Sequence, residues 1–201
     1  MLKLNDKYVQ LSNDVLAVNY WGELLTVELL AGLLRREMGY DFRDIISRQL
    51  MDETRHANVT RALLLERGRD PIRDDGVIEF TYHKLFGEWS QRPYEEVLTF
   101  LGSNEKSSSR NFSSLVKVGT AAGDEQLVTI YSEILNDEVN HSHNIFLALP
   151  DTPEIQNLSQ QAAAAMKAAF SKRYAKLVLA YPDAFGLKPK VTSAAQVRSE
   201  N

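Results

Sequence analysis

The seven-residue pattern Leu-x-Asp-Glu-x-x-His occurs twice in this chain of 201 residues, and it constrains the fold more than any other feature. The copies cover residues 50–56 and 135–141 and are identical at four of seven positions. On a helix, a carboxylate and an imidazole three residues apart share one face, with Cβ atoms about 5–6 Å apart. Two such helices facing each other can hold two metal ions side by side. The alternative, a solvated helix face with an incidental histidine, suits one copy better than a pair, because the chain has only 4 His.

The composition restricts the metal chemistry that is available to the chain. There is no cysteine, which excludes disulfides, iron–sulfur clusters and thiolate zinc sites. The remaining ligands, His, Asp and Glu, suit hard or borderline ions such as iron and manganese. The net charge of −4 argues against a broad nucleic-acid surface. A hydrophobic content of 44% in a chain of this length predicts one domain with a sizeable core.

Hydrophobic periodicity predicts an all-α chain, with helices over about 14–38, 42–68, 93–118, 124–149 and 153–181. Asn13 or Asp14 is the expected N-cap of the first helix, and Gly39 its stop. Residues 69–92, with a short aromatic piece, are interpreted as the long crossover of a one-crossover four-helix bundle. Residues 119–123 are expected to be a loop. Residues 1–181 then form a single helical domain, and residues 182–201 a loosely held tail.

A two-metal carboxylate site in a four-helix bundle needs two Glu-x-x-His motifs and two lone glutamates. Glu23 lies 30 residues before Glu53, and Glu105 lies 33 residues before Glu138. Both lone glutamates fall in the middle of apolar stripes, where an unpaired carboxylate is costly to bury. A shared dication removes that cost. The predicted catalytic and metal-binding set is Glu23, Glu53, His56, Glu105, Glu138 and His141.

Other carboxylates are weaker candidates for the two lone positions. Glu28 is the rival to Glu23, but it is closer to the first motif and falls on a different helix face. Glu125 and Glu133 are less suitable than Glu105, because they share the fourth helix with the second motif and miss its inner stripe.

The aspartate that precedes each glutamate of the motif is a candidate for orienting a histidine. A metal-bound imidazole usually donates its other N–H to a carboxylate. We expect Asp52 to orient His141 and Asp137 to orient His56 across the bundle, an exposed aspartate being the alternative.

Six further residues have two interpretations each. Small residues one turn either side of Glu105 either open a substrate cavity or allow close helix packing; they are Gly102, Ser108 and Ser109. Tyr131, on the face of Glu138, is interpreted as a core tyrosine, with a role near the metals as the alternative. His83 is interpreted as a packed core residue in preference to a channel residue, and His143 as a surface or helix-contact residue.

The six-residue set, with Asp before each Glu-x-x-His, resembles the ferritin-like di-iron carboxylate superfamily over residues 14–149. In layout the chain is similar to two groups of small oxygenases, the tRNA hydroxylase family that acts on a modified adenosine and the cyanobacterial aldehyde-deformylating oxygenases. Residues 51–68, 102–112 and 130–146 carry the first likeness. The resemblance implies a ferritin-like four-helix bundle with one long crossover and an additional C-terminal helix.

The same resemblance implies a non-haem di-iron oxygenase or oxidase. Its cofactors would be two Fe ions, or a Mn/Fe pair, with O2 as co-substrate for hydroxylation or oxidative cleavage. The substrate would be a small organic molecule or a modified nucleoside. Two alternatives stay open: an iron-handling ferroxidase or peroxidase of the rubrerythrin or ferritin type, and a metal-free ferritin-like binding module. The absence of cysteine removes the rubredoxin-type iron site of a complete rubrerythrin.

An external electron donor such as ferredoxin is the expected protein partner. A basic patch near the C-terminus offers it a docking surface or is ordinary solvated surface; it comprises Lys172, Arg173, Lys176, Lys188 and Lys190. Monomer and homodimer both stay open. No apolar run is long enough to span a membrane, and the first 14 residues lack the apolar segment of a signal peptide. The expected location is therefore cytoplasmic.

Overall fold

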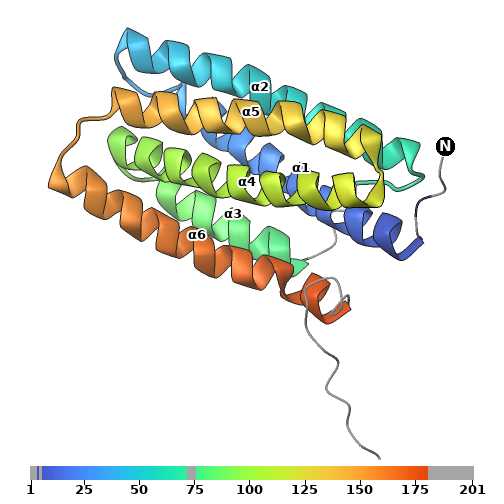
Figure 1. Ribbon diagram of the computed structural model, residues 1–201. Coiled ribbons are helices and arrows are strands. Elements are labelled where there is room, and N and C mark those ends of the chain that lie inside the picture. The colour runs from blue at the N-terminus through green and yellow to red at the C-terminus, as the bar shows by residue number, and fades with distance from the viewer. Residues whose placement is uncertain (1–3, 5, 72–75, 181–201) are drawn as a thin grey trace, which may run out of the picture.

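The structure, a computed structural model, describes residue 4, residues 6–71 and residues 76–180, with the side chains of 76–79, 173, 174 and 176–180 left out. Every regular element in these residues is an α-helix, which confirms the predicted all-α fold. The expected tail at 182–201 lies outside the described residues. The helices are α1 (Asp6–Leu33), α2 (Tyr40–Glu66), α3 (Gly76–Ser90), α4 (Tyr94–Ala122), α5 (Glu125–Ala148) and α6 (Pro153–Ala180) (Figure 1).

Four of these helices pack as two pairs. α1 lies along α2, and α4 lies along α5, each pair joined by a short connection that makes its helices antiparallel neighbours. The pairs meet because α2 lies beside α5 and α1 contacts α4. α3 and α6 form a further layer, in which α3 packs on α1, α6 packs on α4, and the two touch each other (Figure 1).

Two apolar clusters fill the interior on either side of a polar layer. One contains Leu16, Leu63 and Ile134, together with Phe112, on one side of the duplicated motif. The other lies toward the opposite helix ends and contains Leu29, Leu30, Ile46, Phe100, Leu101 and Ile145. Full burial of such side chains contributes about 1.5–3 kcal/mol each relative to exposure. The polar layer between the clusters is therefore held by apolar packing above and below it.

The predicted start of the first helix is wrong, because α1 begins at Asp6 and not at Asn13 or Asp14. Its polar first turns are fixed by contacts with distant residues. The Tyr8 hydroxyl donates to Asp124 at 2.8 Å, and Asp14 pairs with Arg69 at 2.5 Å. These tertiary contacts, which no local pattern reveals, extend the helix toward the N-terminus. At its other end α1 stops at Leu33, ahead of the expected Met38.

The predicted crossover at 69–92 contains a full helix, α3, where only a short aromatic piece was expected. Tyr82, Phe86 and Trp89 recur at helical spacing and are all buried. Phe86 and Trp89 pack against Phe100 of α4, with ring centroids 5.1 and 4.9 Å away. Aromatic packing therefore folds this connection back onto the bundle.

The loop predicted at residues 119–123 is also wrong. α4 continues through Gly119 to Ala122, and Gly123 then ends it with a left-handed backbone at φ 73°. Asp124 caps the next helix, its side chain accepting a hydrogen bond from the Leu127 N–H at 3.2 Å. The turn is thus two residues long, shorter than the run of small residues indicates.

Candidate metal centre

The structure brings all six predicted ligand side chains together in the polar layer of the bundle. Each of the four long helices contributes: α1 gives Glu23, α4 gives Glu105, and α2 and α5 each give one Glu-x-x-His. None of the six is more than 7% exposed. Burial of so many ionisable groups is costly unless their charges are compensated. The cluster therefore requires cations, protons or both.

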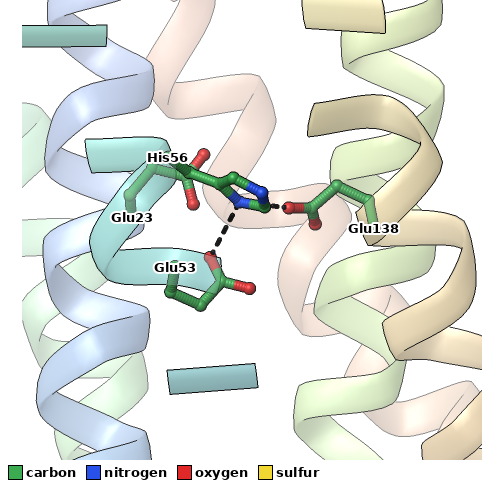
Figure 2. A group of neighbouring side chains, drawn as sticks. All are labelled: Glu23, Glu53, His56 and Glu138. Atoms are coloured by element: carbon green, nitrogen blue, oxygen red, sulfur yellow. Dashed lines mark ion pairs between the residues drawn. The ribbon is translucent and has the colours of Figure 1, made fainter. Parts of the chain in front are cut away.

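The six side chains form two overlapping groups of four. The first group is Glu23, Glu53, His56 and Glu138, and Figure 2 shows the His56 ring directed between the Glu53 and Glu138 carboxylates. The second group is Glu53, Glu105, Glu138 and His141. Within each group, one ligand atom per residue lies within 4.8 Å of the others. Glu53 and Glu138 belong to both groups, so both carboxylates would be shared if each group held an ion.

The two histidines turn the same ring nitrogen toward the centre. His56 Nδ1 lies 3.3 Å from Glu138 Oε1 and 3.6 Å from Glu53 Oε2, and His141 Nδ1 lies 3.1 Å from Glu53 Oε1. Neither Nδ1 makes a hydrogen bond within the described part of the chain, and the same holds for Glu53 Oε2 and Glu138 Oε1. A buried polar atom without a hydrogen bond costs about 1–3 kcal/mol. Ligation of a cation by these atoms would remove that cost.

The other ring nitrogen of each histidine faces an aspartate from the opposite motif. His56 Nε2 lies 3.2 Å from Asp137 Oδ2, and His141 Nε2 lies 3.1 Å from Asp52 Oδ2. This crossed pairing of Asp52 and Asp137 is the one expected from the sequence. With the proton on Nε2 donated to the aspartate, the Nδ1 lone pair is directed at the carboxylates.

Three polar residues that sequence reasoning missed support these groups. Arg55 contacts Asp137 directly and lies 3.9 Å from Asp52, so one guanidinium reaches both histidine-orienting aspartates. Its only sequence signal is the three-residue spacing from Asp52, which places both on one helix face. The Gln49 and Asn104 amides donate to the Glu53 and Glu105 carboxylates, each at 3.4 Å. Gln49 lies one helical turn before Glu53 and so shares its face, whereas Asn104 has no signal beyond its place next to Glu105.

The electrostatics of the cluster reflect crowding of buried carboxylates. Burial raises the pKa of Glu105 well above its ordinary value, and the charges of Glu138 and Glu53 raise it further. Burial and the Glu53 charge also raise the pKa of Glu138. Burial opposes ionisation of Glu53 as well, but the close approach of His141 and His56 outweighs it and lowers the pKa of Glu53.

The pKa values of the two histidines are raised, which complements the lowered pKa of Glu53. Burial favours the neutral imidazole, yet the Glu53 carboxylate outweighs it and raises the pKa of both His56 and His141. Protons on the histidines and on Glu105 and Glu138 can therefore neutralise the cluster when no metal is bound. Two dications supply the same compensation, because four carboxylates carry four negative charges.

The rival carboxylates lie elsewhere. Glu28, Glu125 and Glu133 are all exposed, whereas Glu23 is 6% and Glu105 1% exposed. The interpretation of His83 as a packed core residue is wrong: it is exposed and lines a groove of about 400 Å³ between α1 and α3. Its neighbour Tyr82 occupies the inward face of α3 instead. His143 lies on the surface, one of its two expected positions.

The small residues beside Glu105 have different roles. Gly102 allows close packing, because a Cβ there would lie 2.9 Å from the Phe146 ring of α5. Its carbonyl also accepts a hydrogen bond from the Ser142 hydroxyl at 3.1 Å. Ser109 is half-buried and donates to the Lys106 carbonyl. Ser108 instead lines a small inner pocket.

This inner pocket reaches the ligand set, because Glu23 lines it. Its lining includes Glu23, Asn104, Ser108, Phe112 and Phe170. Its volume of about 20 Å³ is enough for about one water-sized molecule. The pocket therefore places a space for one small molecule beside the Glu23 carboxylate.

Tyr131 lies in the apolar cluster next to the centre and is fully buried. Its hydroxyl is 3.2 Å from Thr60 Oγ1 and accepts from the Asn19 amide at 3.5 Å. Its ring packs edge-on against Phe112, with centroids 5.2 Å apart. These contacts are those of a packed tyrosine with a satisfied hydroxyl.

The structure describes only part of the expected docking patch for an electron donor. Lys172 is exposed on α6. The side chains of Arg173 and Lys176, and the whole of Lys188 and Lys190, lie outside the described residues.

Comparison of the chain with protein-family models, with curated proteins and with solved structures finds no match. Within the described ranges, none of the helices combines the length and apolar character needed to cross a bilayer. What the chain does therefore has to be inferred from its own residues and their geometry.

Proposed function

We propose that the chain is a non-haem di-iron oxygenase or oxidase built on a ferritin-like bundle with one long crossover and an additional C-terminal helix. The observation that most supports this proposal is the pair of overlapping ligand groups that share Glu53 and Glu138. The helix order supports the same proposal. α1, α2, α4 and α5 hold the ligands, α3 lies within the crossover, and α6 is the additional helix.

The donor set fits two iron ions, or a Mn/Fe pair. It consists of four carboxylates and two imidazoles, which are the ligands that these ions prefer. The Nδ1 atoms of His56 and His141 are directed at the shared carboxylates without hydrogen bonds of their own. When bound, the metal pair supplies O2 activation for oxidation of a C–H bond, an aldehyde or an amine.

The chain's own residues prepare the site for such chemistry. Asp52 and Asp137 hold the imidazole protons on Nε2, so that each ring presents its lone pair to the centre. Apolar clusters on both sides exclude water, which strengthens every charge interaction inside. The inner pocket beside Glu23 provides space for a molecule about the size of O2 next to the ligand set. The substrate is a small organic molecule or a modified nucleoside, and an external donor such as ferredoxin supplies electrons.

The test is anaerobic loading of the purified full chain with Fe(II), followed by metal analysis and rapid mixing with O2. We expect about two irons per chain, as the ligand set provides for, and a transient visible absorbance band after mixing. Iron oxidation is then expected to stop. The next experiment is a product screen with aldehydes, amines, lipids and tRNA.

Two outcomes would contradict the proposal and point to its alternatives. Oxidation that continues far past two irons per chain would favour an iron-handling ferroxidase. Absence of bound metal would make the duplicated motif structural and favour a binding module. Glu28→Gln is the matched control, because this carboxylate lies on α1 but is exposed, and its metal content should equal that of the unmodified chain.

A further inference from the structure

A groove between α4 and α6 is lined by three cations and, among the residues that the structure describes, by no acidic side chain. Its volume is about 470 Å³, within the roughly 300–1,000 Å³ typical of small-molecule sites. The cations are Lys106 and Arg110 of α4 and Lys167 of α6. Within the part of the chain that the structure describes, none of the three forms an ion pair. In a chain with a net charge of −4, the groove is a local concentration of positive charge.

Small side chains on both helices create the hollow. α4 contributes Ser103 and Ser107, and α6 contributes Ala163 and Ala164 from its alanine-rich stretch. Ser103 also meets Ser159 of α6, with their hydroxyl oxygens 3.3 Å apart. The two helices therefore touch at a polar contact and leave space beside it.

The groove adjoins the inner pocket of the proposed metal centre. Asn111 and Phe170 line both spaces, so they form the boundary between them. On the far side of that boundary the inner pocket reaches Glu23. Asn104 lines the inner pocket as well and donates to Glu105. A molecule in the groove thus lies next to a space that reaches Glu23 and the Asn104 amide, which donates to Glu105.

We propose that this groove binds the acid group of a small organic anion, a carboxylate or a phosphate ester, whose organic part is directed past Phe170 toward the metal centre. The inference rests on the proposed function and names the substrate class of that site. Ammonium and guanidinium groups form charge-assisted hydrogen bonds with such acids. Arg110 follows Glu105 by five residues, which is about 7.5 Å along α4. The acid group would therefore be held close to the part of the substrate that is oxidised.

The boundary between the two spaces has to open for the substrate to react. The inner pocket holds about one water-sized molecule, which is too small for an organic chain. Phe170 is half-buried and packs edge-on against Tyr82, with centroids 5.7 Å apart. Rotation of the Phe170 side chain would join the groove to the inner pocket.

The test is calorimetric titration of the full chain with octanoate, octyl phosphate and octan-1-ol. The unmodified chain should bind one or both acids more tightly than the neutral alcohol, and the stronger acid identifies the group. The double variant K106Q/R110Q should weaken acid binding by at least about tenfold and leave the alcohol unaffected. K117Q is the matched control, because Lys117 is exposed on the same helix, two turns after Arg110 and outside the groove; it should bind as the unmodified chain does.

Several results would overturn the inference. These are equal binding of acid and alcohol, binding of neither acid, equal weakening by K117Q, or binding of tRNA far tighter than either acid and lost in K106Q/R110Q. Iron content separates this inference from the proposed function. K106Q/R110Q should hold as much iron as the unmodified chain, since Lys106 and Arg110 are exposed and outside the ligand set. A chain that binds no iron would contradict the proposed function. A chain that binds iron but neither acid would contradict only the proposed role of the groove.

Discussion

The two halves of the centre carry almost the same motif in different surroundings. The first half-site comprises Glu23, Glu53 and His56 on α1 and α2, and the second comprises Glu105, Glu138 and His141 on α4 and α5. Glu23 borders the inner pocket, whereas Glu105 is 1% exposed and receives the Asn104 amide. The ligand set is therefore symmetric, but access to it is not.

The aspartates that orient the histidines differ as well. Asp137, the partner of His56, is 24% exposed and is also contacted by Arg55. Asp52, the partner of His141, is 40% exposed and lies 3.9 Å from Arg55. Screening by water weakens the more exposed interaction. We therefore expect the His56 ring to be held more firmly than the His141 ring.

The largest effect is expected from the shared carboxylates. Glu138→Ala removes a ligand from both groups and opens space in the layer, so both ions should be lost at concentrations that saturate the unmodified chain. Metal analysis after anaerobic Fe(II) loading checks this. Full occupancy by two ions in this variant would refute the assignment of Glu138.

A smaller loss is expected from a ligand that belongs to one group only. Glu23→Gln should empty the first half-site and leave about one ion per chain at the second, because Glu23 is absent from the second group. The same metal analysis measures it. Loss of iron in Glu28→Gln with retention in Glu23→Gln would reverse the choice between these two glutamates.

Substitution of the orienting aspartates should lower metal affinity less than substitution of the ligands does. The two aspartates should also differ in the size of their effect. Asp137→Asn and Asp52→Asn should each lower metal affinity by about 10–100-fold, the usual range for partners of ligating histidines. The Asp137 variant should lose more, because it also removes the charge that faces Arg55. Competition with a chelator of known affinity gives the two constants. Equal affinities in both variants and the unmodified chain would remove the proposed role of the aspartates.

The smallest effects concern the packing of the two helix pairs. Gly102→Ala should destabilise the fold by about 1–3 kcal/mol, because its Cβ would press on Phe146 and Ile145 of α5. Gly32→Ala on α1 meets nothing within 4 Å and should stabilise by up to about 1 kcal/mol through helix propensity. Denaturant unfolding of both variants measures the difference. A neutral or stabilising Gly102→Ala would show that α4 and α5 do not need this close approach.

Much of the centre was predictable because its signals are local. Glu53 and His56 share a face through their three-residue spacing, and the second motif repeats that geometry. Glu23 and Glu105 stand out because each interrupts an apolar stripe. The crossed aspartate pairing follows from the chemistry of ligating imidazoles. Each inference needed only helix geometry and the cost of burying charge.

What could not be predicted depends on contacts between distant segments. α1 begins early because Tyr8 reaches Asp124, which is 116 residues away. α3 forms because its aromatic face finds Phe100, although its sequence shows only turn residues and a short aromatic run. His83 is exposed because Tyr82 takes the inward face of that helix. The charged groove needs α6 against α4, an arrangement that neither helix encodes alone.

The most direct measurement of the central claim is anomalous diffraction at the iron edge from crystals of the Fe(II)-loaded chain. Two peaks about 3.5–4 Å apart are expected between α1, α2, α4 and α5, with Glu53 and Glu138 bridging them. One should be ligated by His56 Nδ1 and the other by His141 Nδ1. Iron bound elsewhere, or no iron within the polar layer, would contradict the account.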